Sequence, residues 1–363
     1  METLYKPLEK SHGSGKLKIR PTVTVLLPAY NEAAIIADSL TILCDHMGTL
    51  NDKYQWDILI VNDGSKDETG RLADELAQSL PNISVHHNKV NQNLGGALRN
   101  GFKVAKGEYI VVLDIDLSFG PDHVEKLVDA AIDQDADIVI ASPYMKGGKT
   151  TNIPFHRLLM SKVLNKIMRL TSGINIHSFT GMARAYKKEF LDTLNLKTST
   201  YSINPEIIQK ARIMRGRIVE VPGHLDWTLQ LEYGENRTSS VSVFKGILNG
   251  LMSSFIFRPY GFFMMVGLLL LVASLYMIIW IFYHVYLIYP EIQASGDFFD
   301  DRFSEAVAAA YNKRPHAFLI GGFTFVTAIL FLGLGFISLQ KKRYFDELFH
   351  LNSNILKECR KAK

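Results

Sequence analysis

Two aspartates, Asp114 and Asp116, stand at alternate positions at the end of the apolar run formed by residues 109–113. Negative charge at the end of a buried strand is costly unless something neutralises it. A divalent cation, which prefers oxygen ligands, would do so. Taken alone, such a pair is more often two turn or helix-capping aspartates. Its place directly after a strand-like run favours a metal site.

A second stretch, residues 91–97, contains Gly95 and Gly96 just before a predicted helix. Amides in the first turn of a helix can approach a phosphate closely when no side chain intervenes. A plain loop is an equal alternative for this stretch by itself. The sequence contains neither G-x-x-x-x-G-K-[ST] nor G-x-G-x-x-G, so nucleotide binding of those two kinds has no support.

Strand-like and helix-like segments alternate around these motifs. Apolar, β-branched runs cover residues 23–28, 57–63, 109–116 and 137–142, and helix-like stretches cover residues 32–47, 67–80 and 121–134. Nearly continuous apolar strands separated by helices indicate a parallel sheet covered on both faces. Ligands of such sheets bind at the carboxyl ends of the strands, where the aspartates and the polar stretches 28–32 and 62–65 stand.

The composition excludes several classes of protein. The chain has 363 residues, of which 47% are hydrophobic and 21% charged, so it is neither disordered nor collagenous. A net charge of +4 gives no argument for nucleic acid as a partner. Its two cysteines, Cys44 and Cys359, are too far apart and too isolated to indicate a disulfide framework or a zinc site. Residues 1–20 lack the apolar core of a signal peptide.

Two long uncharged stretches follow, at residues 259–290 and 315–340. About 20 apolar residues cross a bilayer, so each stretch predicts a transmembrane helix, with buried core helices as the alternative. Lys245 and Arg258 precede the first stretch and residues 341–343 are all basic, whereas the loop between the stretches is rich in acids. The positive-inside rule then places both termini in the cytoplasm.

These observations divide the chain into five parts. We predict an N-terminal extension (1–20), a cytoplasmic α/β domain (21–240), an interfacial amphipathic helix (241–258), two transmembrane helices (259–340) with an extracytoplasmic loop (290–316), and a basic cytoplasmic tail (341–363). The tail has apolar residues at near-helical spacing, which fits either a helix on anionic lipid or an ordinary solvated tail. Two helices bury little intramembrane surface alone, which favours a homo-oligomer.

The motifs together resemble those of the inverting family 2 glycosyltransferases, which have the Rossmann-like GT-A fold. The resemblance covers about residues 21–237 and rests on the order and spacing of residues 28–32, 62–65, 93–97 and 114–116. With two terminal spans, the chain is most similar to the polyprenyl-phosphate glycosyltransferases, the group that contains dolichyl-phosphate mannose synthase. The resemblance implies transfer of one sugar from a nucleotide-sugar donor to a polyprenyl phosphate in the membrane, with Mg²⁺ or Mn²⁺ as cofactor.

The resemblance also implies roles for individual residues. The positions that match nucleotide-sugar contacts are Pro28, Ala29, Tyr30, Glu32, Asp63, Gly95, Asp114 and Ile115. Asp114 and Asp116 match the metal pair that grips the donor diphosphate. Asp116, Glu206 and Arg237 match catalytic positions, Glu206 near the sugar and Arg237 over the diphosphate. Arg157 and Ser161 match the residues that receive the lipid phosphate, and residues 178–182 match a turn beneath the sugar.

Two positions depart from the family pattern. Pro143 stands where the family often has an arginine after the fourth strand, with Lys146 or Lys149 as the nearest substitute cation. Ser118 stands where a glutamine often joins the metal. These departures make the wider class more secure than a mannose synthase in the narrow sense.

The implied reaction needs little from the protein beyond positioning. A phosphate monoester has a second pKa near 6, so the lipid phosphate is already a nucleophile and needs no strong general base. One alternative is a processive polysaccharide or glycolipid synthase with another acceptor, but its Gln-x-x-Arg-Trp stretch is absent, since Gln209 is followed by residues KARI. The other is a membrane scaffold on a retired enzyme fold, which would have no reason to keep costly clustered carboxylates.

Overall fold

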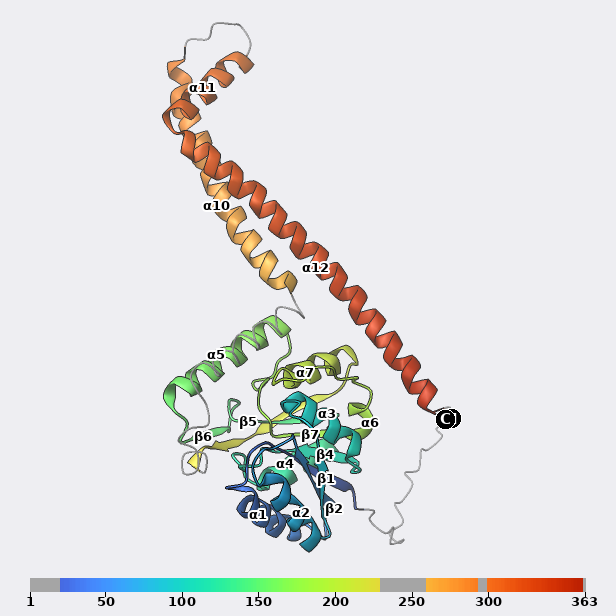
Figure 1. Cartoon of the computed structure of the whole chain (residues 1–363). Helices are drawn as coiled ribbons and strands as arrows, with labels where there is room; N and C mark the ends of the chain where they lie inside the picture. Colours follow the sequence, from blue (N-terminus) through green and yellow to red (C-terminus); the bar gives the residue numbers. More distant parts are fainter. Residues whose placement is uncertain (1–19, 229–258, 293–298, 362–363) are drawn as a thin grey trace, which may run out of the picture.

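The computed structural model describes residues 20–228, 259–292 and 299–361. An α/β domain forms one end of the molecule, and two long helices project from it (Figure 1). The predicted extension at residues 1–20, apart from Arg20, and the predicted interfacial helix at 241–258 lie outside the described residues.

A seven-stranded sheet with the order β3-β2-β1-β4-β7-β5-β8 forms the centre of the α/β domain. Its strands are β1 (Thr22–Ala29), β2 (Gln55–Asn62), β3 (Ile83–His87), β4 (Tyr109–Val112), β5 (Ile138–Ser142), β7 (Arg184–Lys187) and β8 (Ile218–Pro222). Only β7 runs antiparallel to its neighbours, β4 and β5. The prediction of a mostly parallel sheet is confirmed, and β1, β2, β4 and β5 correspond to the four predicted runs.

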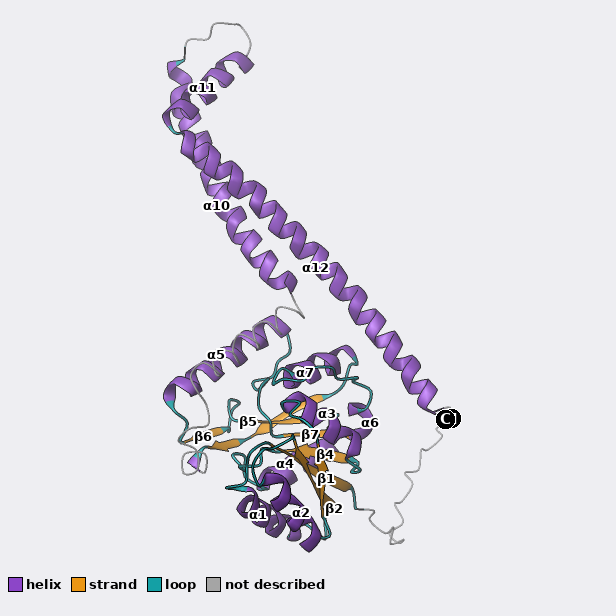
Figure 2. Ribbon diagram, viewed as in Figure 1, coloured by secondary structure: helices purple, strands orange, loops and turns teal. Residues whose placement is uncertain are grey.

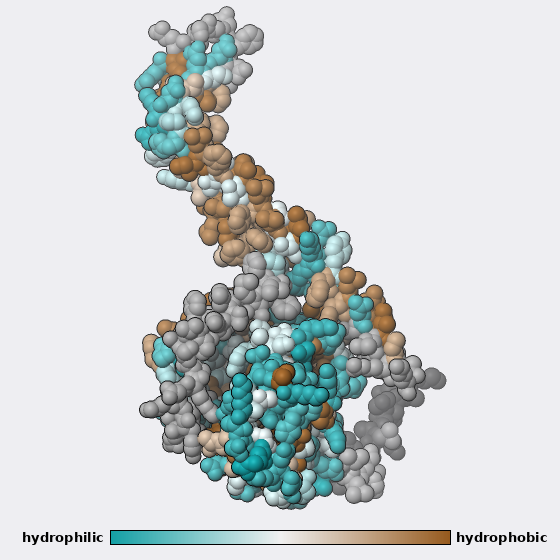
Figure 3. All heavy atoms as spheres, in the orientation of Figure 1, coloured by the Kyte–Doolittle hydropathy of each residue, from teal (hydrophilic) through white to brown (hydrophobic). Residues whose placement is uncertain are grey.

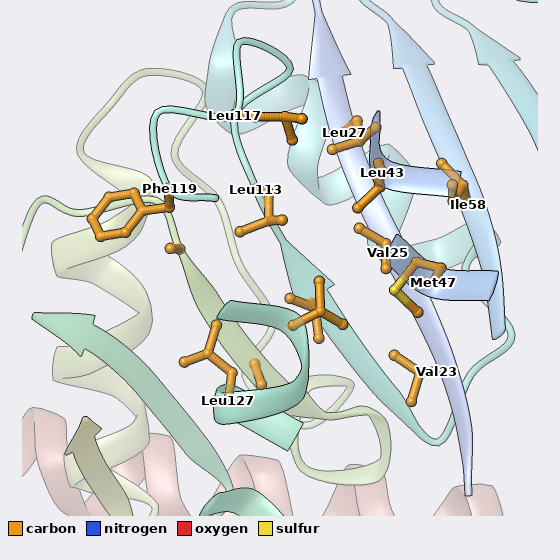
Figure 4. Close-up of a cluster of buried hydrophobic side chains, with 14 of the residues drawn as sticks. Val23, Val25, Leu27, Leu43, Met47, Ile58, Leu113, Leu117, Phe119 and Leu127 are labelled. Carbon is orange, nitrogen blue, oxygen red and sulfur yellow. The ribbon is translucent and has the colours of Figure 1, made fainter. Parts of the chain in front are cut away.

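Helices cover both faces of this sheet (Figure 2). One face carries α1 (Ile36–Gly48), α2 (Thr69–Ser79) and α4 (Asp122–Asp133), and the other carries α3 (Leu94–Val104), α5 (Phe155–Ser172) and α7 (Ile203–Ile213), with the short α6 (Lys188–Leu191) after β7. Side chains alternate along β1, so that Val25 and Leu27 face the first layer and Leu26 the second. Figure 4 shows buried side chains of the core between the sheet and the layer of α1, α2 and α4.

A second, two-stranded sheet joins β6 (Lys149–Thr151) to β9 (His224–Asp226). The two strands are parallel, and Thr150 pairs with Leu225. The Trp227 amide extends the contact by donating to the Thr151 carbonyl at 3.1 Å. This small sheet brings the start of α5 beside the end of the described α/β domain.

The two long helices are α10 (Pro259–Ile288) and α12 (Pro315–Lys361). Their apolar windows have mean hydropathies of 2.6 and 2.3, and only 11% and 17% of those windows are buried inside the structure. A buried core helix would be mostly covered, so this alternative is wrong, and Figure 3 shows the apolar band they form. Gly267 and Gly335 let the helices approach closely, because a Cβ would lie 2.9 Å from Leu332 and 2.7 Å from Met264, respectively.

Regular structure also occurs where the sequence indicated only a loop or an uncertain tail. A helix, α11 (Phe299–Lys313), lies within the predicted loop, and Ala306 and Ala310 pack against Val285 of α10. The 3-10 helix η1 (Tyr289–Glu291) ends the first span. After its apolar part, α12 continues without interruption through the basic residues 341–343 and past the α/β domain (Figure 1).

Candidate active site at the carboxyl edge of the sheet

Three carboxylates converge where β1 and β4 end. Asp114 and Asp116 follow β4 in a tight turn, in which the Leu117 amide donates to the Asp114 carbonyl at 3.0 Å and the Ser118 amide donates to the Asp116 carboxylate at 2.9 Å. Lost hydration, the charge of Asp116 and the charge of Glu32 raise the pKa of Asp114 to about 8. We call Glu32, Asp114 and Asp116 the acid cluster.

The acid cluster fits a divalent cation by its donor atoms. All three side chains offer oxygen ligands, and a bound cation would offset the repulsion that raises the pKa of Asp114. Across residues 20–228 and the described parts of the helices, no three acidic, His or Cys side chains are placed to hold a metal ion by themselves, and this includes the acid cluster. A cation held here would therefore also need oxygen atoms from another molecule.

The loop after β1 is held against the loop after β2. Asn31 has a φ of +57°, its side chain accepts from the Lys66 amide at 2.8 Å, and its own amide donates to the Ser65 hydroxyl at 3.0 Å. The Glu32 amide donates to the Thr69 hydroxyl at 2.7 Å. These bonds place Glu32 beside the aspartates of β4, although the two strand ends are more than 80 residues apart in sequence.

Four other residues predicted to contact the nucleotide sugar lie in or near this loop. Tyr30 is 40% exposed at its rim, whereas Ala29 is buried and Pro28 partly buried. Ile115 is 4% exposed and belongs to the hydrophobic core, so its side chain contributes packing between the two aspartates. Only Tyr30 of these presents a large exposed side chain.

Asp63 links the ends of β2 and β3. Its buried carboxylate accepts from the Asn88 side-chain amide at 2.7 Å and from the Gln92 backbone amide at 2.9 Å. Its own amide donates to the Ala29 carbonyl at 2.9 Å. Asp63, a predicted base or ribose contact, therefore also holds residues 88–92 in place.

Gly95, a predicted donor contact, also contacts the backbone of a distant segment. Its amide donates to the Ser199 carbonyl at 2.9 Å, so at this position the first turn of α3 binds a protein carbonyl. A Cβ at Gly95 would lie 2.4 Å from the Thr198 carbonyl oxygen. The glycine is therefore explained by the close approach of residues 198–200, a contact that links segments 100 residues apart and that local sequence does not reveal.

Glu206 holds the same segment from the other side. Its buried carboxylate accepts from the backbone amides of Lys197 and Thr198, both at 2.9 Å, and forms an ion pair with Lys210 at 2.6 Å. Every contact that the structure gives this side chain is internal to the domain. Glu206, predicted near the sugar, thus also holds residues 197–201, which we call the α7 entry loop.

Tyr201 in the α7 entry loop was not among the predicted site residues. Tyr201 is 77% exposed as a whole residue, yet lost hydration and the charges of Asp114 and Glu32 raise the pKa of its phenol, so the side chain lies within electrostatic range of the acid cluster. The sequence carries no local signal for this, because Tyr201 reaches the site through the contacts of Gly95 and Glu206. Its position makes it a candidate contact for any ligand of the acid cluster.

The turn at residues 177–182 is held by buried polar side chains. Glu220 accepts from the amides of His177 (2.7 Å) and Ser178 (2.9 Å). The fully buried Arg184 donates to the carbonyls of Phe179 and Gly181, each at 2.8 Å. Arg184 was missed because it is the first residue of β7, whose four residues RAYK also include Lys187, so the local sequence does not indicate its burial.

The predicted phosphate residues lie together on the first turns of α5. Ser161 accepts from the Tyr144 hydroxyl at 2.7 Å. The guanidinium of Arg157 lies over the Trp227 ring, 5.2 Å from its centroid. Trp227 follows β9, so the two-stranded sheet positions the residue against which Arg157 packs. Neither Tyr144 nor Trp227 was predicted.

The remaining predicted positions have simpler outcomes. Pro143 is buried, and Lys146 and Lys149 are exposed. Ser118 is buried, and its carbonyl accepts from the Asp226 amide at 2.8 Å. Arg237 lies outside the described residues.

An exposed apolar face runs along α5. Its members Phe155, Leu159, Val163 and Leu170 are 77%, 50%, 49% and 75% exposed. Spacings of four residues place the first three on one side of the helix. Exposed apolar side chains in such a row are typical of a surface that contacts a membrane or a partner.

Comparisons with known proteins found similar sequences and structures. Residues 24–194 match the model of "Glycosyl transferase family 2". The chain is 35% identical to a polyprenol monophosphomannose synthase of Mycolicibacterium smegmatis, over 60% of this chain and 83% of that protein. It is 31% identical to an undecaprenyl-phosphate mannosyltransferase of Micrococcus luteus, over 62% of this chain and 91% of that protein. A solved mannosyltransferase of Pyrobaculum calidifontis, in complex with GDP-Man and Mn²⁺, has a TM-score of 0.43 at 15% identity and covers 95% of this chain and 89% of that one.

Proposed function

The chain belongs to glycosyl transferase family 2, and from this premise we propose that it transfers one hexosyl residue from a nucleotide sugar to a polyprenyl phosphate, with inversion. The relatives named above are a polyprenol monophosphomannose synthase and an undecaprenyl-phosphate mannosyltransferase. The acceptor class comes from them. The residues that would perform the transfer come from the site.

The acid cluster is the observation that carries this proposal. Its carboxylates lie at the carboxyl edge of the sheet, where open α/β sheets bind ligands. The polar loops after β1 and β2 border it and are fixed to one another, which suits a nucleoside that needs preformed contacts. Tyr30, Glu32 and Asp63 are the proposed nucleoside contacts on these loops.

Asp114 and Asp116 are the proposed metal ligands. The lost hydration and mutual repulsion of these carboxylates favour a site that binds a cation together with the donor. When bound, Mg²⁺ or Mn²⁺ would act as a Lewis acid that stabilises the departing nucleoside diphosphate. Ile115 keeps the two aspartates at a fixed spacing by packing between them in the core.

The acceptor phosphate is assigned to Arg157 and Ser161. Both are on α5, whose exposed apolar face would lie against the bilayer and bring these side chains to the depth of a lipid phosphate. The guanidinium donates charge-assisted hydrogen bonds to such a group. Trp227 and Tyr144 hold Arg157 and Ser161 in orientation.

The protein's task in the transfer is then to orient two anionic molecules. The dianionic lipid phosphate attacks the anomeric carbon, and the bond from that carbon to the nucleoside diphosphate breaks. No general base has to remove a proton. Arg237 is proposed as a further cation near the diphosphate, and the α7 entry loop, held by Glu206, presents Tyr201 to the same region.

The two apolar helices indicate a membrane protein. We place the α/β domain and both chain ends on the cytoplasmic side, because basic residues flank the outer ends of the two spans and acids dominate the connection between them. Nucleotide sugars are supplied in the cytoplasm, so this orientation gives the acid cluster access to its donor.

The proposal is tested with membranes that contain the full chain. They are incubated with radiolabelled nucleotide sugars, Mg²⁺ or Mn²⁺ and polyprenyl phosphate, and label is counted in the organic phase. We expect acid-labile label with the wild type and at least about 10³-fold less with Asp116→Asn. Asp135→Asn, which changes an exposed carboxylate, should retain activity. Equal organic-phase counts in wild type and Asp116→Asn would overturn the proposal.

A further inference from the structure

A pocket of about 650 Å³ lies between α7 and the part of α12 that follows its apolar segment. The stretch of α12 that lines it includes Ser338, Lys341 and His350. Pro259, the first residue of α10, also lines it. At this level α10 begins, and α12 passes from its apolar part into the basic residues 341–343. The pocket is therefore at the boundary between the proposed membrane region and water.

Positive charge predominates in the pocket lining. The lining contains four cations, Arg212, Arg215, Lys341 and Lys342, but only two carboxylates, Asp346 and Glu347. Lys342 forms an ion pair with Asp346 at 2.5 Å, and Arg212 donates to the Ser172 carbonyl. Across the described ranges of the chain, no salt bridge links Arg215 or Lys341 to an acid. Two cations are thus available to an anionic ligand.

Apolar groups complete the wall. Ile213, Pro259 and Phe345 line the pocket beside the cations. A soluble anion would gain nothing from such surfaces, whereas a lipid has an acyl segment directly next to its charged headgroup. A volume of this size lies within the range of sites for small organic ligands.

We propose that this pocket binds the phosphate-bearing headgroup of an anionic membrane phospholipid. Basic pockets beside membrane helices on the cytoplasmic side recognise headgroups in this way. The site is distinct from the proposed acceptor site, because neither Arg157 nor Ser161 lines it. It does not depend on the proposed sugar transfer, since binding can be measured without a donor.

The bound lipid would fix α12 against the α/β domain. The two already touch at Lys210 of α7, whose ammonium lies 5.5 Å from the centroid of the Phe349 ring. Lys210 also pairs with Glu206, the residue that holds the α7 entry loop. A headgroup at one end of α7 therefore supports the helix that positions Tyr201 at its other end.

The test uses the full chain purified in detergent and native mass spectrometry. The probe is dioleoyl phosphatidylglycerol, with dioleoyl phosphatidylcholine as the neutral comparison. We expect one tightly held phosphatidylglycerol per chain and at least about tenfold weaker binding by the double variant Arg215→Gln/Lys341→Gln. Arg343→Gln removes a cation next to this stretch of α12 but outside the pocket, and should bind as the wild type does. Lys341→Arg keeps the charge and should retain binding.

Several results would overturn the proposal. They are unchanged affinity in the double variant, an equal loss in Arg343→Gln, or equal binding of phosphatidylcholine. Displacement of phosphatidylglycerol by millimolar inorganic phosphate would indicate a site for a soluble anion. Displacement by an equal concentration of undecaprenyl phosphate would assign the pocket to the acceptor lipid. Unchanged melting temperatures confirm that the variants are folded.

Discussion

The carboxylate of Glu206 lies 2.6 Å from the ammonium of Lys210, one turn further along α7, and both side chains are nearly inaccessible to solvent. The same carboxylate accepts two backbone hydrogen bonds from the α7 entry loop. A buried ion pair is weak support for a fold, but removing one partner leaves the other charged and unpaired. The pair therefore makes the position of the loop sensitive to a single substitution on α7.

Glu206→Gln should lower the free energy of unfolding by about 3 kcal/mol at pH 7. Lost hydration tends to raise the pKa of Glu206, but hydrogen bonds from Lys210, Thr198 and Lys197 outweigh it and hold that pKa below its ordinary value of 4.5. The stabilisation is therefore complete above about pH 4.5 and lost as pH falls through the depressed pKa of the folded state. Thermal unfolding of the purified full chain from pH 7 to pH 3 measures this.

Glu125→Gln is the matched control, because Glu125 pairs with Lys53 at 2.7 Å on the surface. Glu125→Gln should change the free energy of unfolding by less than about 1 kcal/mol. If the difference in free energy of unfolding between Glu206→Gln and the wild type stayed constant down to pH 3, the stabilising role of the ionised Glu206 would be contradicted.

Gly95→Ala tests the contact between α3 and the α7 entry loop. Alanine is the better helix former, so a free site would gain up to about 1 kcal/mol. At Gly95 the added Cβ would meet the Thr198 carbonyl at 2.4 Å, and we expect a loss of about 1–3 kcal/mol with reduced transfer. Gly48→Ala is the control, since no atom lies within 4 Å of its Cβ. Similar stabilities and activities of the two variants would show that the loop is not held in this way.

Arg157→Ala tests the assignment of the acceptor phosphate. A hydrogen bond to a charged group contributes about 1.5–3 kcal/mol, so kcat/KM for polyprenyl phosphate should fall about ten- to a hundredfold. The KM for the nucleotide sugar should stay within about twofold. Lys162→Ala removes an exposed cation from the same helix and should leave both constants nearly unchanged. If Arg157→Ala changed only the KM for the nucleotide sugar, Arg157 would be assigned to the donor site instead.

The orientation in the membrane can be tested with a native cysteine. Cys359 is exposed near the end of α12, after the second span. A membrane-impermeant maleimide should label it in inverted membrane vesicles and not in intact cells, in a Cys44→Ser background. A cysteine introduced by Asp301→Cys in α11 should show the opposite pattern. Labelling of Cys359 in intact cells would place the chain ends on the outer side.

The sequence allowed prediction of those parts of the site that follow strands directly. β1, β2 and β4 have apolar runs that end in polar residues, so Glu32, Asp63, Asp114 and Asp116 could be assigned to one edge of a parallel sheet. That these residues lie close together follows from the general topology of parallel sheets, in which the carboxyl ends of the strands share one edge. The lengths of the two spans were similarly evident, because hydropathy alone decides them.

The parts that could not be predicted depend on contacts between distant segments. Gly95 and Glu206 both contact the segment 197–200, and Tyr201 comes within electrostatic range of the acid cluster through the same packing. Trp227 meets Arg157 only because β6 pairs with β9. Helix α11 was missed although its alanine-rich run at residues 306–310 favours a helix, whereas its packing against Val285 depends on α10 and is not visible in the sequence.

Transfer to a lipid phosphate is tested most directly by the identity of the product. The purified full chain in lipid nanodiscs is given undecaprenyl phosphate, Mg²⁺ and each nucleotide hexose in turn, and the lipid extract is analysed by mass spectrometry. We predict a new lipid heavier than undecaprenyl phosphate by one hexosyl residue, formed in equal amount to the free nucleoside diphosphate and absent with Asp116→Asn. A glycan polymer in the aqueous phase, with the undecaprenyl phosphate unchanged, would contradict the proposed function.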